Sequence, residues 1–123
     1  MRDILENIFV TALEGGSNYW YFLPSKEVKK IRKEVPKTDE PALSVAMFMA
    51  IFDKGVEVAV HDAENPEECL GTLSRASIME SLNVLADNEN FRSFWEIELN
   101  EDGDAESSDV IFQYLVMGEI VFG

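Results

Sequence analysis

The residues best suited to chemistry lie between positions 61 and 69, where the only histidine of the chain, His61, precedes a turn rich in acids. The cluster is made up of His61, Asp62, Glu64, Glu67, Glu68 and Cys69. Catalysis would need the histidine beside a carboxylate and a nucleophile, and a metal site would need three or four converging ligands. The spacing fixes neither arrangement. A histidine at the end of a strand, next to a turn aspartate, is typical of local hydrogen bonding, so we assign no catalytic residue here and lean away from an enzyme.

A second acidic segment has the spacing of a calcium-binding loop. The segment is ELNEDGDAESSD, and the loop pattern requires oxygen ligands at positions 1, 3, 5 and 12 and glycine at position 6. Glu98, Asn100, Asp102, Gly103 and Asp109 occupy those positions. However, position 1 is not aspartate, and position 12 is not the bidentate glutamate that the pattern uses. We therefore favour a solvated acidic loop, leave cation binding as an open alternative, and predict no metal and no cofactor.

An aromatic run and a basic segment point to a different kind of site. Four rings follow one another in residues 19–22, and a basic island follows with Lys26, Lys29, Lys30, Arg32, Lys33 and Lys37. Rings that stack on a base, together with lysines that pair with phosphate, would bind a nucleotide. The residues of such a ligand site would be Tyr19, Trp20, Lys29, Lys30 and Lys33. The competing interpretation, which we prefer, places one face of the aromatic run in the core.

The charge of the chain is extreme and unevenly distributed. The net charge is −14 over 123 residues, and residues 55–123 contain only Arg75 and Arg92 against sixteen acids. A chain of this kind repels long nucleic acid, so we expect no direct binding to it, and we expect a strong electrical dipole. The acids concentrate in a candidate partner-binding surface: Glu96, Glu98, Glu101, Asp102, Asp104, Glu106 and Asp109.

Hydrophobic periodicity predicts an α+β fold in a single domain spanning residues 1–123. We expect a small antiparallel sheet packed against three to five helices. The predicted helices cover residues 3–13, 25–35 (helix or loop), 42–54, 74–86 and 109–117, with residues 91–99 helical at first and then extended. The predicted strands cover residues 18–23, 55–61, 69–73 and 118–123, and the terminal strand is expected to lie beside the aromatic run. The helix over residues 42–54 is apolar nearly all round, so we place it at the centre of the core.

The apolar N-terminal stretch is interrupted by Glu6 and Asn7, so it is typical neither of a secretory signal nor of a membrane span. Cys69 is the only cysteine and cannot form an internal disulfide. We therefore expect a cytoplasmic protein with no membrane partner.

Two segments carry a resemblance to known proteins. ALEGGSNYW (Ala12–Trp20) and DAESSDVIFQYLVMGEIVFG (Asp104–Gly123) resemble the signature segments of small uncharacterised proteins of tailed phages and prophages, and His61-Asp62 matches a middle element of the same family. The resemblance covers about a quarter of the chain. It implies a phage or prophage origin and the cytoplasm of a bacterial host, and it implies no activity.

Three functions remain open at this stage. The leading hypothesis is a non-enzymatic phage accessory protein that binds a host or phage protein through its acidic surface, for example as a defence antagonist or a DNA mimic. The alternatives are the nucleotide-binding module described above and a homo-oligomeric structural or virion-associated protein.

Overall fold

Six α-helices and one three-stranded antiparallel sheet form from the residues that the structure describes, which confirms the predicted α+β class. The computed structural model describes residues 2–36, 38 and 41–123. The helices are α1 (Arg2–Thr11), α2 (Ser25–Glu34), α3 (Leu43–Lys54), α4 (Arg75–Val84), α5 (Glu89–Leu99) and α6 (Ala105–Met117). The strands are β1 (Tyr21–Phe22), β2 (Val58–Asp62) and β3 (Cys69–Leu73). Lys37 of the basic island lies outside the described residues.

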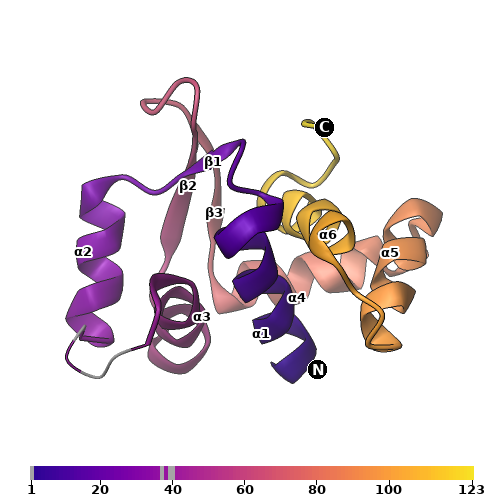
Figure 1. The fold of residues 1–123 in the computed structure, drawn as a ribbon, viewed down its shortest axis with the longest axis horizontal. Helices are drawn as coiled ribbons and strands as arrows, with labels where there is room; N and C mark the ends of the chain where they lie inside the picture. Colours follow the sequence, from indigo (N-terminus) through magenta and orange to yellow (C-terminus); the bar gives the residue numbers. More distant parts are fainter. Residues whose placement is uncertain (1, 37, 39–40) are drawn as a thin grey trace.

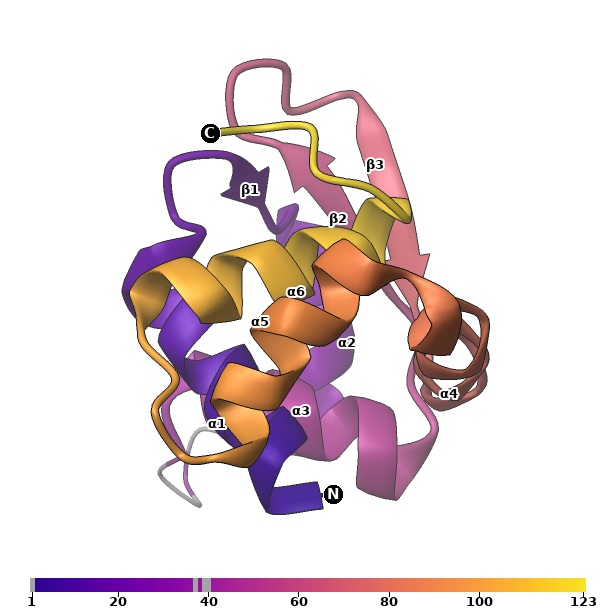
Figure 2. The ribbon, with the colours of Figure 1, turned by 90° about the vertical axis from the view of Figure 1, so that its right-hand side faces the viewer.

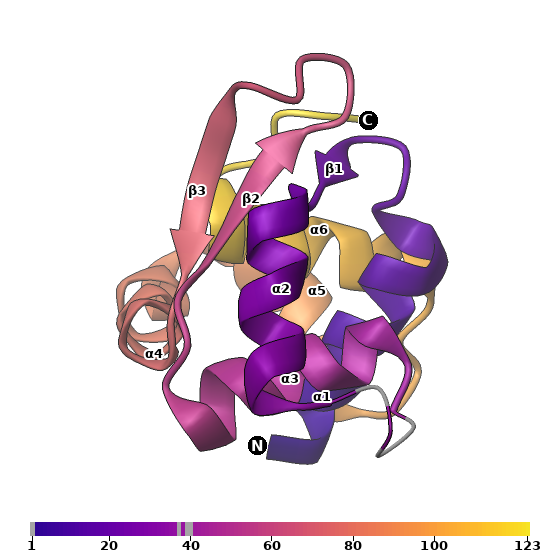
Figure 3. The same ribbon diagram turned by 90° about the vertical axis from the view of Figure 1, so that its left-hand side faces the viewer.

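The sheet stands in the middle of the molecule, with α2 on one side and α6 on the other (Figure 1). Its strand order is β1-β2-β3, and both neighbouring pairs are antiparallel. Helix α5 packs outside α6, and α1 packs between α6 and α3 (Figure 2). Seen from the opposite side, α2 runs in front of β2 (Figure 3). The long axis of the molecule therefore runs from the basic helix α2 to the acidic helix α5.

Helix α6 is the most deeply buried element. All ten residues from 107 to 116 are buried, although four of them (Ser107, Ser108, Asp109 and Gln113) are polar. Helix α3, which the sequence places at the centre, is also largely buried, and Phe48 and Phe52 form part of the aromatic core. The centre of the core is thus shared between α3 and α6. Because the polar side chains of α6 are buried, they need hydrogen-bond partners inside the protein.

The turn that follows α1 is a π-helical turn, Ala12–Gly16, closed by the amide of Ser17 on the carbonyl of Ala12 at 2.8 Å. Its last glycine lies against the first residue of α6. A Cβ on Gly16 would lie 2.5 Å from the carbonyl oxygen of Ala105, so only glycine allows the two segments to approach this closely. This contact brings the segment Ala12–Trp20 against the start of the segment Asp104–Gly123.

Local signals in the sequence set several boundaries correctly. Ser74 caps α4 as predicted, since its hydroxyl accepts from the Ser77 amide at 3.0 Å. Strand β3 has the predicted bounds, and Gly55 closes α3 with a left-handed φ of 71°. At these positions, interactions between residues close in the sequence were therefore sufficient to predict where a helix or strand begins or ends.

Three predictions about extended structure were wrong. Residues 89–99 are helical throughout and do not become extended at their end, and the described residues form six α-helices instead of three to five. The segment 118–123 forms no strand, and β1 contains two residues instead of six. Intrahelical hydrogen bonds satisfy the backbone of residues 89–99, backbone turn bonds to the Ser17 carbonyl precede β1, and the side chain of Gln113 bonds to residues 121–122.

Among the described residues, no helix has both the length and the apolar character needed to cross a membrane.

A buried glutamate joins α2 to the sheet. Glu27 is 3% exposed and accepts the Ala59 amide at 2.8 Å, and it pairs with Lys30 Nζ at 2.8 Å. Burial alone would raise the pKa of Glu27, but the hydrogen bonds from Lys30 and from the Ala59 amide outweigh burial and lower this pKa. The ionised carboxylate is therefore part of the native fold.

We expect Glu27→Ala to lower the free energy of unfolding by about 2 kcal/mol at pH 7, because the substitution leaves the Ala59 amide without its acceptor. Since the folded-state pKa is lowered, this contribution is present at neutral pH and is lost as the pH falls below the ordinary value of 4.5. Denaturant unfolding at pH 7 and at pH 3 measures both effects. Glu34→Ala, an exposed change on the same helix, serves as the control and should change stability by less than about 0.5 kcal/mol.

Candidate functional site

A buried carboxylate, Asp109 of α6, connects the two segments that carry the resemblance. Its Oδ1 accepts Ser17 Oγ and Trp20 Nε1, each at 2.7 Å. Its Oδ2 accepts Tyr19 OH at 2.6 Å and Gln113 Nε2 at 3.2 Å. With four donors on two oxygens, the carboxylate is stabilised in its buried position without a cation.

Gln113, one turn further along α6, extends this network to the C-terminal segment. Its Oε1 accepts the amides of Val121 and Phe122, both at 2.9 Å, and its Nε2 donates to the Phe122 carbonyl at 3.2 Å. One side chain thus supplies the hydrogen bonds that a neighbouring strand would give. The terminal segment lies beside the aromatic run, as predicted, but it is held there without sheet pairing.

Trp20 is part of the core, which is a correction to its assignment as a ligand-binding residue. Its ring is 1% exposed and stacks on Phe122 with a centroid distance of 5.4 Å. The indole N–H is already donated to Asp109, so neither the face nor the edge of Trp20 is available to a nucleotide. The preferred interpretation of the aromatic run, that one face is core, holds for this ring. Tyr19, by contrast, is 49% exposed.

A second buried carboxylate, Glu98, ties α5 to α6. It is 3% exposed, and its Oε1 accepts Ser107 Oγ at 2.8 Å and Ser108 Oγ at 2.9 Å. Gly103 packs directly on this carboxylate, and a Cβ at that position would overlap the Glu98 oxygens. Glu98 therefore fixes the connection between the two helices from the inside.

The acidic corner consists of the exposed carboxylates around this connection: Glu96, Glu101, Asp102, Asp104 and Glu106. Glu98 and Asp109 do not belong to it, which corrects their assignment as partner-binding residues, because both point inward to hydrogen-bond donors. Asp104 also caps α6, since its Oδ1 accepts the Ser107 amide at 3.0 Å. Two exposed apolar side chains, Ile97 and Leu99, lie on the same last turns of α5.

The described members of the basic island, from Lys26 to Lys33, lie on α2, at the end of the long axis opposite to α5 (Figure 1). Lys29 and Lys33 are exposed there, whereas Lys30 pairs with Glu27 and donates to the Glu57 carbonyl at 2.7 Å. The island therefore does not meet Trp20 in one pocket, and the combination of ring and lysines that defines the nucleotide hypothesis is not assembled.

The histidine cluster is a local turn. His61 Nδ1 lies 2.7 Å from the Pro66 carbonyl, and Asp62 Oδ1 accepts the Glu64 amide at 2.8 Å. Cys69 pairs with His61 across the sheet but is exposed. This is the predicted pattern of local hydrogen bonding.

The calcium-loop register does not form a loop, because its first and last positions lie inside α5 and α6. Within the described part of the chain, no three His, Cys, Asp or Glu side chains are placed to share a metal ion.

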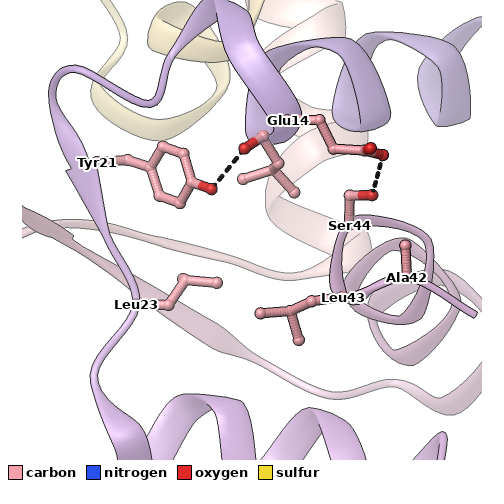
Figure 4. Close-up of a pocket in the computed structure, with 7 residues that line it drawn as sticks. Glu14, Tyr21, Leu23, Ala42, Leu43 and Ser44 are labelled. Atoms are coloured by element: carbon pink, nitrogen blue, oxygen red, sulfur yellow. Dashed lines mark hydrogen bonds between the residues drawn. The ribbon is translucent and has the colours of Figure 1, made fainter. Parts of the chain in front are cut away.

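A small cavity of about 150 Å³ lies between the π-helical turn, β1 and the start of α3 (Figure 4). Two hydrogen bonds close its rim: Tyr21 OH donates to the Leu13 carbonyl, and Ser44 Oγ donates to Glu14 Oε2, each at 2.6 Å. Burial, followed by the charge of Glu14, raises the pKa of Tyr21. Covalent catalysis needs a nucleophile, a base and a group that orients the base, and among the described residues the Ser44–Glu14 pair has no such third group. The cavity therefore carries no chemistry that we can assign.

The chain matches no protein-family model, and comparison with curated proteins and with solved structures gives no match. The resemblance to phage and prophage proteins stays a prediction. The structure shows that polar side chains from the two quoted terminal segments meet in the Asp109 network, whereas His61 and Asp62 belong to the β2–β3 turn.

The sequence analysis did not predict that two residues of the acidic segment, Glu98 and Asp109, point into the interior. The available signal was the pair Ser107-Ser108 within a run of acids, together with Gln113 one turn after Asp109 on the same face of an otherwise apolar helix. Hydroxyl and amide side chains among apolar residues indicate internal partners for buried carboxylates.

We expect Asp109→Asn to lower the free energy of unfolding by about 3 kcal/mol. Whichever way the new amide is oriented, its NH₂ group faces a donor that cannot reverse, either the Trp20 indole or the Gln113 amide that is held by the terminal segment. Denaturant unfolding, with the exposed change Asp102→Asn as the matched control, measures the effect. Equal stability of the two variants would contradict a central role for Asp109.

We expect Tyr19→Phe to lower the free energy of unfolding by about 1 kcal/mol at pH 7. Partial burial, the hydrogen bond to Asp109 and the charge of that carboxylate raise the pKa of Tyr19 to about 12. A raised pKa means that the contribution is present below the ordinary value of 10.0 and is lost as the pH rises from 10 toward 12. Unfolding of both proteins at pH 7 and near pH 11 tests this, and a difference that is independent of pH would contradict it.

Proposed function

We propose that the protein is a non-enzymatic binding protein that uses its acidic corner to bind a basic protein partner. In the setting that the resemblance implies, the partner is a host or phage protein in an infected bacterium. A nucleic-acid-binding partner fits this surface, because carboxylates then meet side chains that otherwise bind phosphates.

The observation that carries the proposal is a cluster of unpaired carboxylates held on a rigid connection. The two ion pairs within the described residues, Arg2–Asp53 and Lys30–Glu27, lie outside the acidic corner. No lysine or arginine follows Arg92 in the sequence. The negative charge of the acidic corner is therefore not neutralised by ion pairs among the described residues, and it is available to a basic partner.

Two features of the corner are unfavourable for the isolated protein. Glu96 lies in the last turn of α5, where the helix dipole disfavours negative charge and where no basic residue compensates. Glu101 has a left-handed φ of 59°, which is uncommon for a residue with a side chain. Local choices that oppose stability are typical of functional sites.

The corner is also preorganised for binding. Glu98 holds the connection through Ser107 and Ser108, and Asp104 caps α6, so the exposed acids do not need to be ordered when a partner arrives. Ile97 and Leu99 add apolar surface beside the charges, and such mixtures are found where apolar contacts are surrounded by polar ones.

The test compares two triple variants with the same change in net charge. Glu96→Gln/Glu101→Gln/Asp102→Asn neutralises the corner and leaves the Asp104 cap intact. Glu64→Gln/Glu67→Gln/Glu68→Gln neutralises three exposed acids of the β2–β3 turn. The immobilised proteins are used to capture partners from a bacterial lysate, and each captured protein is purified and titrated at 50 to 500 mM salt. These salt concentrations span Debye lengths from about 14 to about 4 Å.

We expect the corner variant to bind a basic partner at least about tenfold more weakly and the turn variant to bind it like the wild type. The corner variant should be as stable as the wild type or slightly more stable, because removal of Glu96 relieves the helix-dipole conflict. A partner that binds both variants equally would contradict the proposal. A wild-type oligomer that captures nothing would instead support the structural, homo-oligomeric alternative.

A further inference from the structure

A second cavity, of about 340 Å³, lies where α1, α3 and α4 meet. These three helices occupy the lower half of the view in Figure 2. Its lining is mixed: three residues are apolar and three are charged, and they are Leu5, Phe52, Met79, Arg2, Asp53 and Arg75.

Arg2 is held in one position. Its two terminal nitrogens donate to the two carboxylate oxygens of Asp53 at 2.7 and 2.8 Å, and its guanidinium lies 5.1 Å from the centre of the Phe48 ring. Asp53 offsets the charge of Arg2, and both of its carboxylate oxygens already accept hydrogen bonds from Arg2. The fixed pair therefore forms one wall of the cavity and contributes no net charge.

Arg75 supplies the uncompensated charge. Its closest polar partner is the Phe52 carbonyl at 3.4 Å, a long contact, and no ion pair involves it within the described part of the chain. Residues 55–123 contain only two basic residues, and one of them lines this cavity. In a chain with a net charge of −14, the lining of this cavity carries a net positive charge.

The apolar part of the lining sets the size and character of a ligand. Leu5 and Phe52 are 1% and 8% exposed, whereas Met79 is 46% exposed and offers a flexible apolar side chain to a ligand. The cavity is open to solvent on one side, and its volume of about 340 Å³ is sufficient for a body of one or two aromatic rings that stays partly exposed. A guanidinium matches the planar geometry of a carboxylate with two parallel hydrogen bonds.

We propose that this cavity binds a small organic carboxylate whose apolar body has the size of one or two aromatic rings. The carboxylate pairs with Arg75, and the apolar body packs on Leu5, Phe52 and Met79. An inorganic anion lacks the apolar contacts and a neutral aromatic molecule lacks the ion pair, so each binds more weakly than the amphipathic anion. The site does not involve the acidic corner and does not depend on the proposed function.

The test uses 2-naphthoate as the probe and 2-naphthamide as its neutral counterpart. Titration of the ¹⁵N-labelled full chain, followed by amide chemical shifts, gives both the affinity and the location of binding. For a ligand of this size we expect saturable binding with a Kd of about 1 mM or below. The shifts should centre on the cavity residues Leu5, Phe52, Asp53, Arg75 and Met79, and 2-naphthamide should bind about tenfold more weakly.

Two variants and one control separate the ion pair from general charge effects. Arg75→Gln should weaken naphthoate binding about tenfold. Arg92→Gln makes the same change in net charge on α5, away from the cavity, and should bind like the wild type. Met79→Glu places a carboxylate in the lining and should abolish binding. Arg75 and Met79 are both exposed, so both variants should fold, and their thermal unfolding verifies this.

The proposal is overturned if naphthoate causes no saturable shifts at these residues up to about ten times the expected Kd. It is equally overturned if the amide binds as tightly as the carboxylate, or if Arg92→Gln weakens binding as much as Arg75→Gln.

Discussion

A carboxylate buried without a cation must be surrounded by hydrogen-bond donors, and Asp109 obtains its donors from segments that are far apart in the sequence. Ser17, Tyr19 and Trp20 come from the turn after α1, and Gln113 comes from α6 itself. Burial of Asp109 therefore requires the first and last parts of the chain to assemble together. The stacking of Trp20 on Phe122 and the close contact between the π-helical turn and α6 depend on this same arrangement.

The network accounts for the inward orientation of several polar side chains near the two ends of the chain. These polar side chains form hydrogen bonds with one another in the interior, so they stabilise the fold. Gln113 shows this clearly, since its amide substitutes for a β-strand along residues 121–122. Function must therefore be sought in groups that this network does not use, and those groups lie on α4, α5 and the adjoining surfaces.

Local signals predicted the elements whose boundaries depend on nearby residues. The Ser74 cap, the glycine that ends α3 and the limits of β3 all follow from short-range chemistry. The terminal segment, Trp20 and the orientation of Glu98 depend on contacts between distant residues, which periodicity does not report. Alternation of Trp95, Ile97 and Leu99 with glutamates indicated a strand, but packing of α5 on α6 overrides that preference. The acidic segment was found from composition, whereas the division between its buried and exposed members required the structure.

Buried and exposed acidic side chains have different roles in this protein. Glu27, Glu98 and Asp109 are buried, hydrogen-bonded and stabilising, so neutralising any of them weakens the fold. The carboxylates of the acidic corner make no ion pair within the described residues, and some occupy positions that the helix dipole or the backbone disfavours. Asp104 and Glu106 stabilise the start of α6, whereas Glu96 and Glu101 occupy positions that give no such stabilisation. Uncompensated charge on a connection that Glu98 holds from the inside supports the proposed recognition of a basic partner, because the cost of ordering the surface has been met during folding.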